Sequence, residues 1–558
     1  MAAFHGLGKQ NTELVLRNSP ATQTAILFSG LCAFVIFFGA YGFIAPWGGD
    51  INVHLAAVHS LYRDMWNPSD LSLDAKTGYS VFFSPYTVLV ALAGRMLGVT
   101  PYRALEIAGI FNVALYASAI ALFCRTFSAV PKSPWPPLLF LAVSLFLRSK
   151  IYSWSSETSY LTLSITQAYP SLLGWSLALF AFVATEHVAR KRSAVAIAGL
   201  ALLIALLMLT HPLTASWTIG IVGLRALYLL ATAASELSHE DKFRLAAVRS
   251  IVTPSLAIAG SLALGIALSL LWPYYSPLGL VHLAGIQQND TFGSDPFGAM
   301  QLTYLLAIAA LLLSARRHVY QFWIVAFVAT FGALELLRML GIEMADRYVF
   351  FMGFFAQFIV ADCAAAAFTQ LLSARGKHAG SPWSPRIANG VYLALFGIAF
   401  LYAPALHSPL RSGILTSQAW RDGKSGERAY YSRWEPLRAV IRPGEILMIA
   451  PSFEAGFAIP AVTGAKVITA TAIDPVPDAA ERASAVQRFF TAGQTPGVRL
   501  QDLKRWHATK VVLIAPTLDL AREMEALFGP PVWRDESRIV FAVGQNALSW
   551  QRTGSPPA

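Results

Sequence analysis

Long apolar runs separated by short polar segments make up most of the chain as far as residue 405. Each run is long enough to cross the roughly 30 Å hydrocarbon layer of a membrane as a helix. The runs lie at 24–46, 80–98, 104–124, 171–188, 194–211, 213–231, 252–272, 298–315, 319–340, 348–372 and 387–405. The pattern therefore predicts a polytopic α-helical membrane protein with about eleven transmembrane helices.

One further apolar stretch, residues 136–150, is shorter and ends in Arg148 and Lys150, and the segment 153–159 is too polar to span. We interpret it as re-entrant or interfacial, so that twelve or thirteen spans remain open alternatives. The first run has no small-residue cleavage site and is longer than the core of a signal peptide. It is expected to be retained as a transmembrane helix.

The composition excludes an ordinary soluble globule, because 55% of the residues are hydrophobic and only 13% are charged, with a mean hydropathy of +0.52. The net charge of +11 does not indicate a nucleic-acid partner, since the basic residues gather in short loops as they do on the cytoplasmic side of membrane proteins. With Lys9 and Arg17, this distribution predicts a cytoplasmic N-terminus. An odd number of spans then puts the C-terminus outside.

The composition changes after residue 406, which indicates a second domain. Residues 1–406 are expected to form the transmembrane domain with a large first outer loop at 47–79, and 407–437 a polar linker. Short β-rich runs then alternate with amphipathic helical stretches, which predicts a small extracytoplasmic α/β domain at 438–545, followed by a tail at 546–558. Its charged residues are spaced as on a solvated surface, and it has no phosphate-binding glycine loop.

The first outer loop begins with a carboxylate directly after a membrane span, at Asp50. Carboxylates are costly near hydrocarbon and usually have a function there, although Asp50 is also a suitable N-cap for a following helix. His54 lies four residues further on, so the pair is a candidate site for a divalent cation (Mg²⁺ or Mn²⁺). Residues 54–66 have the spacing of an amphipathic helix on the membrane surface, with His59 on its solvated edge.

A first helix that ends in an acid, an amphipathic helix in the first outer loop, about eleven spans and a C-terminal α/β domain together resemble the GT-C superfamily of integral membrane glycosyltransferases. That family uses polyprenyl-phosphate-linked sugars as donors. Asp50 stands alone in Gly48-Gly49-Asp50-Ile51, without the Asp-Glu pair of the protein mannosyltransferase branch. The resemblance does not extend to a protein acceptor.

The resemblance implies an enzyme of the bacterial inner membrane, with its α/β domain in the periplasm. It would move a sugar from the lipid donor to an envelope glycan or lipid, with Asp50 as general base. Apart from the divalent cation, no cofactor is implied.

Donor-phosphate groups are sought among outer-face cations, which gives Arg347, Arg338 and His211 as candidates. The alternatives are a structural ion pair of Arg347 with Asp346 or Glu343, and a His211 satisfied by backbone at the helix break beside Pro212. The candidates for contacts with the acceptor or the sugar are Tyr274, Tyr275 and Glu157, although the two tyrosines also fit an interfacial aromatic belt.

A transporter or flippase of lipid or solute with an accessory outer domain is the alternative function. Such a protein would also carry intramembrane ionisable residues, here Glu335, Arg338 and Asp362. It does not require a large outer α/β domain, and the internal repeats common among transporters are not evident.

Overall fold

The protein is represented by a computed structural model, which describes residues 20–43, 51–68, 73, 80–148, 158–236, 245–277, 298, 300–313, 317–373, 385–403, 426–450, 453–469 and 478–544. The chain divides into two compact units. The helical unit comprises Met1–Gly42, Gly109–Trp272 and Ser276–Arg421, and the α/β unit comprises Phe43–Ala108, Pro273–Tyr275 and Asp422–Ala558.

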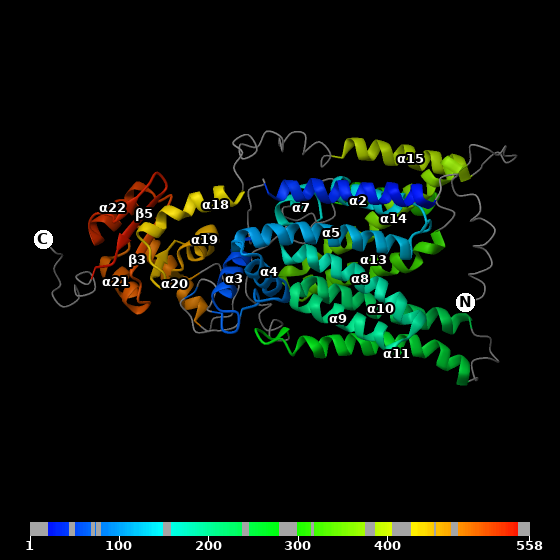
Figure 1. The fold of residues 1–558 in the computed structure, drawn as a ribbon, viewed down its shortest axis with the longest axis horizontal. Helices are drawn as coiled ribbons and strands as arrows, with labels where there is room; N and C mark the ends of the chain where they lie inside the picture. Colours follow the sequence, from blue (N-terminus) through cyan, green and yellow to red (C-terminus); the bar gives the residue numbers. More distant parts are fainter. Residues whose placement is uncertain are drawn as a thin grey trace. The chain divides into compact units, whose positions relative to one another are not determined.

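The helical unit is a bundle of long helices that run side by side (Figure 1). Its elements are α2 (Pro20–Gly42), most of α5 (Pro101–Phe127), α6 (Trp135–Phe146), α7 (Tyr160–Thr166), α8 (Pro170–Lys191), α9 (Ala194–Thr210), α10 (Pro212–Glu236), α11 (Leu245–Ser269), α12 (Gln301–Leu313), η4 (Arg317–Tyr320), α13 (Gln321–Met339), η5 (Glu343–Arg347), α14 (Tyr348–Ser373) and α15 (Pro385–Tyr402).

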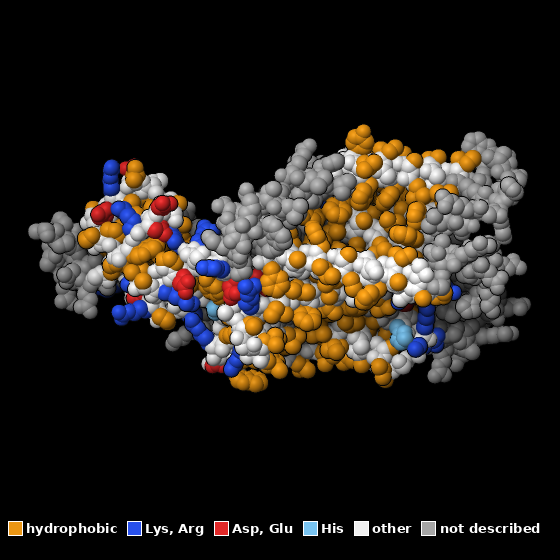
Figure 2. Space-filling view, turned by 45° about the horizontal axis from the view of Figure 1, so that its top comes forward, with side chains coloured by type: hydrophobic (Ala, Val, Ile, Leu, Met, Phe, Trp, Pro, Cys, Tyr) orange, Lys and Arg blue, Asp and Glu red, His pale blue; other side chains and the backbone are white. Residues whose placement is uncertain are grey.

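Within the described residues, seven helices are long and apolar enough to cross a membrane, and five further apolar helices are shorter. Each of the predicted runs coincides with one of these helices. Hydrophobic side chains cover most of the visible surface of this unit (Figure 2), as a lipid environment requires. The prediction of a polytopic α-helical membrane protein is confirmed. The short stretch at 136–150 forms α6, which packs against α14.

Aromatic rings fill the core of the bundle around α14. Trp217 stacks on Phe351 with ring centroids 4.5 Å apart, and Phe123 lies edge-on to Phe354 and Phe358. Large aromatic side chains bury much apolar area each, so this cluster accounts for a large share of the packing between α5, α10 and α14.

Two charged clusters inside the bundle are satisfied by neighbouring side chains and backbone. Asp362 of α14 accepts hydrogen bonds from the Ser128 hydroxyl, from the Ala129 N–H at 2.9 Å and from the Tyr320 hydroxyl at 2.8 Å. Glu186 pairs with Arg225 at 2.6 Å. These contacts join helices and stabilise their packing.

The α/β unit contains a five-stranded sheet with the strand order β2-β1-β3-β5-β4. β1 is parallel to β2 and β3, whereas β5 is antiparallel to β3 and β4. The elements are α3 (Ile51–Arg63), α4 (Pro85–Leu97), the start of α5, α18 (Gly426–Trp434), η8 (Glu435–Ala439), β1 (Ile446–Ile449), α19 (Phe453–Thr463), β2 (Lys466–Val467), α20 (Ala479–Phe490), α21 (Pro496–Arg505), β3 (Lys510–Ile514), α22 (Leu518–Phe528), β4 (Trp533–Arg534) and β5 (Arg538–Ala542). The predicted α/β fold of the C-terminal region is confirmed.

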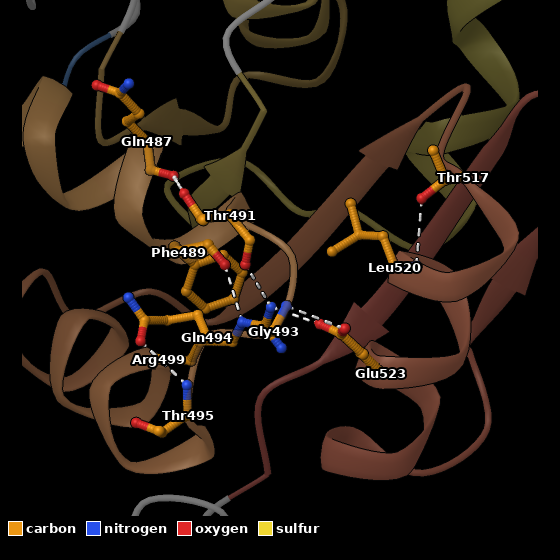
Figure 3. Close-up of polar contacts among 10 residues, drawn as sticks. All are labelled: Gln487, Phe489, Thr491, Gly493, Gln494, Thr495, Arg499, Thr517, Leu520 and Glu523. Atoms are coloured by element: carbon orange, nitrogen blue, oxygen red, sulfur yellow. Dashed lines mark hydrogen bonds and ion pairs between the residues drawn. The ribbon is translucent and has the colours of Figure 1, made fainter.

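The charged residues of this region are not all on a solvated surface, contrary to the sequence prediction. Arg499 is only 2% exposed. Its guanidinium donates to the carbonyls of Phe489 and Thr491, each at 2.9 Å, and pairs with Glu523 at 2.6 Å (Figure 3). Because Glu523 also accepts from the Gly493 N–H at 3.2 Å, the cluster ties α20, α21 and α22 together.

The helix of the first outer loop, α3, is also more enclosed than the sequence predicted. Ten of its thirteen residues are buried, because it packs between α4 and the C-terminal helix α19. A helix lying on a membrane surface would leave its polar face open. α3 is instead part of the core of the α/β unit.

Candidate functional site

The predicted site residues fall into two groups, one in each unit, and each group is described by itself. Asp50 and Glu157 lie outside the described residues. Asp50 is the residue directly before α3, so the position of this helix fixes where the chain continues from the predicted base.

His54 lies on α3 and is 6% exposed. Its ring meets that of Phe82 edge-on, with centroids 5.4 Å apart. In the part of the chain that the structure describes, no group of three or more His, Cys, Asp and Glu side chains could hold a metal ion. Since Asp50 is not among those residues, the cation site at Asp50 and His54 stays a prediction.

Tyr274 and Tyr275 are buried in the α/β unit. The hydroxyl of Tyr274 donates to the carbonyl of Met65, just after α3, and its ring packs against Phe83 with centroids 5.8 Å apart. Tyr274 therefore holds the C-terminal end of α3, in addition to any role in binding a sugar.

His59 is not on a solvated edge, contrary to the sequence prediction. Its Nε2 lies 3.2 Å from the Tyr431 hydroxyl of α18. Burial, and then the positive charges of Arg63 and Arg438, lower the pKa of His59 to about 3, so the imidazole is neutral at physiological pH. This bond joins the first outer loop to the C-terminal region.

A second contact of the same kind was not found from the sequence. Arg103, near the start of α5, pairs with Glu106 and lies 2.6 Å from Glu427 of α18, which also accepts from the Thr100 hydroxyl. The partners are more than three hundred residues apart in the chain, so no local pattern could have revealed them.

In the helical unit, His211 connects α9 to α10 and caps the second helix. Its Nδ1 lies 2.7 Å from the Thr214 hydroxyl and accepts the Thr214 N–H at 3.3 Å, while Pro212 occupies the first helical position. An Nδ1 that accepts from backbone N–H leaves the proton of the neutral ring on Nε2. Gly174 leaves room for this residue, because a Cβ there would lie 2.9 Å from the Cβ of His211.

Arg347, at the end of η5, acts electrostatically on His211. Burial of the imidazole, together with the positive charge of Arg347, lowers the pKa of His211 to about 3. The structure thus brings two of the three predicted phosphate-binding residues together, with the imidazole neutral and able to donate from Nε2.

Arg338 is engaged differently. Its Nε donates to Asp346 at 2.8 Å and its Nη1 to Glu335 at 2.9 Å. Since Asp346 directly precedes Arg347, the ion triad fixes the turn that carries Arg347. The sequence had considered Asp346 as a partner of Arg347, whereas its carboxylate pairs with Arg338.

Comparison with known proteins places this fold among membrane glycosyltransferases. No protein-family model and no curated protein sequence matches the chain. Among solved structures, the apo oligosaccharyltransferase of Archaeoglobus fulgidus matches with a TM-score of 0.53 at 12% identity, over 88% of this chain and 69% of that protein. The same enzyme in complex with Zn and sulfate matches with a TM-score of 0.52, at 12% identity over 87% of this chain and 67% of that one.

Arabinofuranosyltransferase AftD from Mycobacteria also matches, with a TM-score of 0.54 at 15% identity. The alignment covers 93% of this chain but only 40% of AftD, which is a much longer protein. These similarities extend over nearly the whole chain. They show that it has the GT-C fold, as the sequence resemblance implied.

Proposed function

We propose that the protein is a membrane glycosyltransferase that moves a sugar from a polyprenyl-phosphate-linked donor to an extracytoplasmic glycan or lipid of the cell envelope. The observation that carries the proposal is the GT-C fold, which this chain shares over most of its length with an oligosaccharyltransferase and an arabinofuranosyltransferase. The single acid at the end of the first span, Asp50, stands where this chemistry requires a base.

In this reaction, an oxygen of the acceptor hydroxyl attacks the anomeric carbon while the bond from that carbon to the phosphate oxygen breaks. Asp50 takes the hydroxyl proton, and the polyprenyl phosphate leaves with its negative charge. A displacement of this kind inverts the anomeric centre. A divalent cation at Asp50 and His54 would supply further charge stabilisation, and the oligosaccharyltransferase with bound Zn makes a metal in this fold a reasonable expectation.

The departing phosphate needs cations or hydrogen-bond donors directed at it. Arg347 and the Nε2–H of His211 are the proposed groups, supported by the electrostatic coupling between them. Arg338 would contribute through Asp346, by holding the turn on which Arg347 lies. Tyr274, Tyr275 and Glu157 remain proposed contacts with the sugar or the acceptor.

Placement of the C-terminal domain on the same side of the membrane as Asp50 is supported by the α/β unit, because α3 and the C-terminal sheet belong to one compact body. The bacterial inner membrane, with a periplasmic C-terminal domain, is the location we propose.

Transport of lipid or solute receives less support. Of the ionisable residues that would serve it, Asp362 is held by three hydrogen bonds, and Glu335 and Arg338 pair with each other. Such contacts are typical of groups that stabilise helix packing.

The test is to incubate purified protein in lipid vesicles with a panel of polyprenyl-phosphate pentoses and hexoses and to measure release of polyprenyl phosphate. Asp50→Asn is expected to reduce the rate about a hundredfold or more, the usual loss for a general base, without changing thermal stability. The control is Asp64→Asn, because the Asp64 carboxylate only accepts from the Trp66 and Asn67 N–H groups of a turn, each at 3.0 Å. Activity of Asp50→Asn within a few fold of wild type would show that Asp50 is not the base.

A further inference from the structure

A small basic hollow lies inside the α/β unit, between α3 and α19. It is lined from one side by His59, Ser60 and Arg63 of α3, and from the other mainly by Ala461, Gly464 and Lys466. The three residues of α3 lie on one face of that helix, which is the face turned toward α19. The hollow encloses about 270 Å³, open solvent at its mouth included. That is below the roughly 300–1,000 Å³ of pockets for drug-sized molecules, so it suits a single small group.

The charge around this hollow is positive. Arg63 and Lys466 line it, and no carboxylate is among the described residues that do. Arg63 is exposed, and its side chain makes no hydrogen bond or ion pair with another described residue. The positive charge of Arg438 also reaches His59 at the wall of the hollow, although Arg438 itself lies near Glu435.

Gly464 allows the guanidinium of Arg63 to lie at this wall. A Cβ at position 464 would come within 2.6 Å of one terminal nitrogen of Arg63 and 3.2 Å of the other. The φ angle of Gly464 is +77°, so glycine is favoured there for its backbone conformation as well. The carbonyl end of α19 makes a cation acceptable at this place, but it does not neutralise a second one.

We propose that this hollow binds a phosphate group, held in two-pronged fashion by Arg63 and electrostatically by Lys466. A guanidinium matches two oxygens of a phosphate, and a compact ammonium serves as a second point charge beside it. The phosphate can come from a phospholipid headgroup or from a soluble phosphate compound. The proposal is independent of glycosyl transfer, because its test measures binding alone.

The test uses the full-length protein in an uncharged detergent, with inorganic phosphate titrated at constant ionic strength and the apparent melting temperature as the readout. Wild type is expected to show saturable stabilisation, and acetate at the same concentrations none. In Arg63→Gln the apparent Kd should be at least about tenfold weaker, because a charge-assisted pair of hydrogen bonds is lost. Lys466→Gln should weaken it less.

The matched control is Arg522→Gln, since Arg522 is an exposed arginine on α22 of the same unit and does not line the hollow. This variant should titrate like wild type. No saturable effect in wild type, an equal effect of acetate, or an unchanged titration of Arg63→Gln would each overturn the proposal.

The source of the phosphate is decided by repeating the titration in vesicles of phosphatidylcholine with and without phosphatidic acid. A lipid headgroup as ligand should abolish the response to inorganic phosphate when phosphatidic acid is present. A soluble ligand should leave the response intact in both kinds of vesicle.

Discussion

At the scale of single residues, the two arginines of the proposed donor site differ in what already holds them. Arg338 pairs with Glu335 and Asp346, whereas Arg347 acts on the imidazole of His211. A substitution at each should therefore have a different effect. Arg347 is expected to bind phosphate directly, and Arg338 is expected to support the turn before it.

Arg347→Ala should weaken binding of a polyprenyl phosphate about ten- to a hundredfold, which corresponds to roughly 1.5–3 kcal/mol for hydrogen bonds to a charged group. Arg347→Lys should restore only part of the affinity, because a point charge replaces a fork. Arg338→Ala should weaken binding and also lower the melting temperature, since it leaves two carboxylates without their partner. Titration of a polyprenyl-phosphate analogue into each variant measures both effects. Unchanged affinity in Arg347→Ala would move the phosphate site elsewhere.

His59 makes a pH-dependent contribution to stability that the sequence did not predict. Its pKa in the folded protein is about 3, below the ordinary 6.5. Between these pH values the unfolded chain binds a proton that the folded chain does not bind, so stability falls as the pH drops from about 6.5 toward 3.

His59→Gln should therefore lose less thermal stability than wild type between pH 7 and pH 5, because glutamine can bond the Tyr431 hydroxyl and does not titrate. Melting temperatures at the two pH values measure the difference. The control is His507→Asn, a change at an exposed histidine with a positive φ angle of 53° that asparagine tolerates. An equal loss in His59→Gln and wild type would contradict this explanation.

At the scale of elements, the pattern of apolar residues was sufficient to locate the helices of the bundle. Each of the predicted runs overlaps an apolar helix, and the four β-rich runs of the C-terminal region coincide with β1, β2, β3 and β5. These elements are local, because their periodicity or length is written in contiguous residues. Boundaries moved by a few residues where prolines begin helices, as at Pro20, Pro170 and Pro385.

What the sequence could not give is the environment of α3. Its spacing fitted a half-exposed surface helix, but the side opposite its apolar face is covered by α19, about four hundred residues further along the chain. The bond from His59 to Tyr431, across 372 positions, is a consequence of the same packing. Long-range contacts of this kind leave no local periodicity. The same reason explains why Asp346 was assigned to the wrong arginine.

The packing of α3 on α19 depends on small residues, and this allows a sharp test. Ala461 is 3% exposed at the contact. Ala461→Leu should lower the stability of the α/β unit by about 1–3 kcal/mol, the usual cost of overpacking. Because α3 begins directly after Asp50, the rate of glycosyl transfer should fall as well. Ala480→Leu, on an exposed face of α20, should change neither quantity. A normal transfer rate in a destabilised Ala461→Leu would show that α19 does not position the base.

At the scale of the whole molecule, the arrangement across the membrane is the prediction with the widest consequences. Basic loops mark the cytoplasmic face, and an odd number of spans places everything after about residue 406 outside. The structure adds that α3 and the C-terminal sheet form one compact unit, so a site at Asp50 and the C-terminal domain should share a side. If the domain were cytoplasmic, the proposed base would be cytoplasmic as well.

Limited trypsin digestion of membrane vesicles separates the two arrangements. In right-side-out vesicles, trypsin should cut between about Arg421 and Arg433, and most readily at Arg421 and Lys424, which precede helix α18 at Gly426. An antibody against the C-terminal tail detects the released fragment, and a periplasmic marker protein outside the vesicles confirms their orientation. Inverted vesicles should protect the same bonds until detergent is added. Protection in right-side-out vesicles, with cleavage in inverted ones, would overturn the topology. It would also remove the site at Asp50 from the outer face, since the same compact unit contains both.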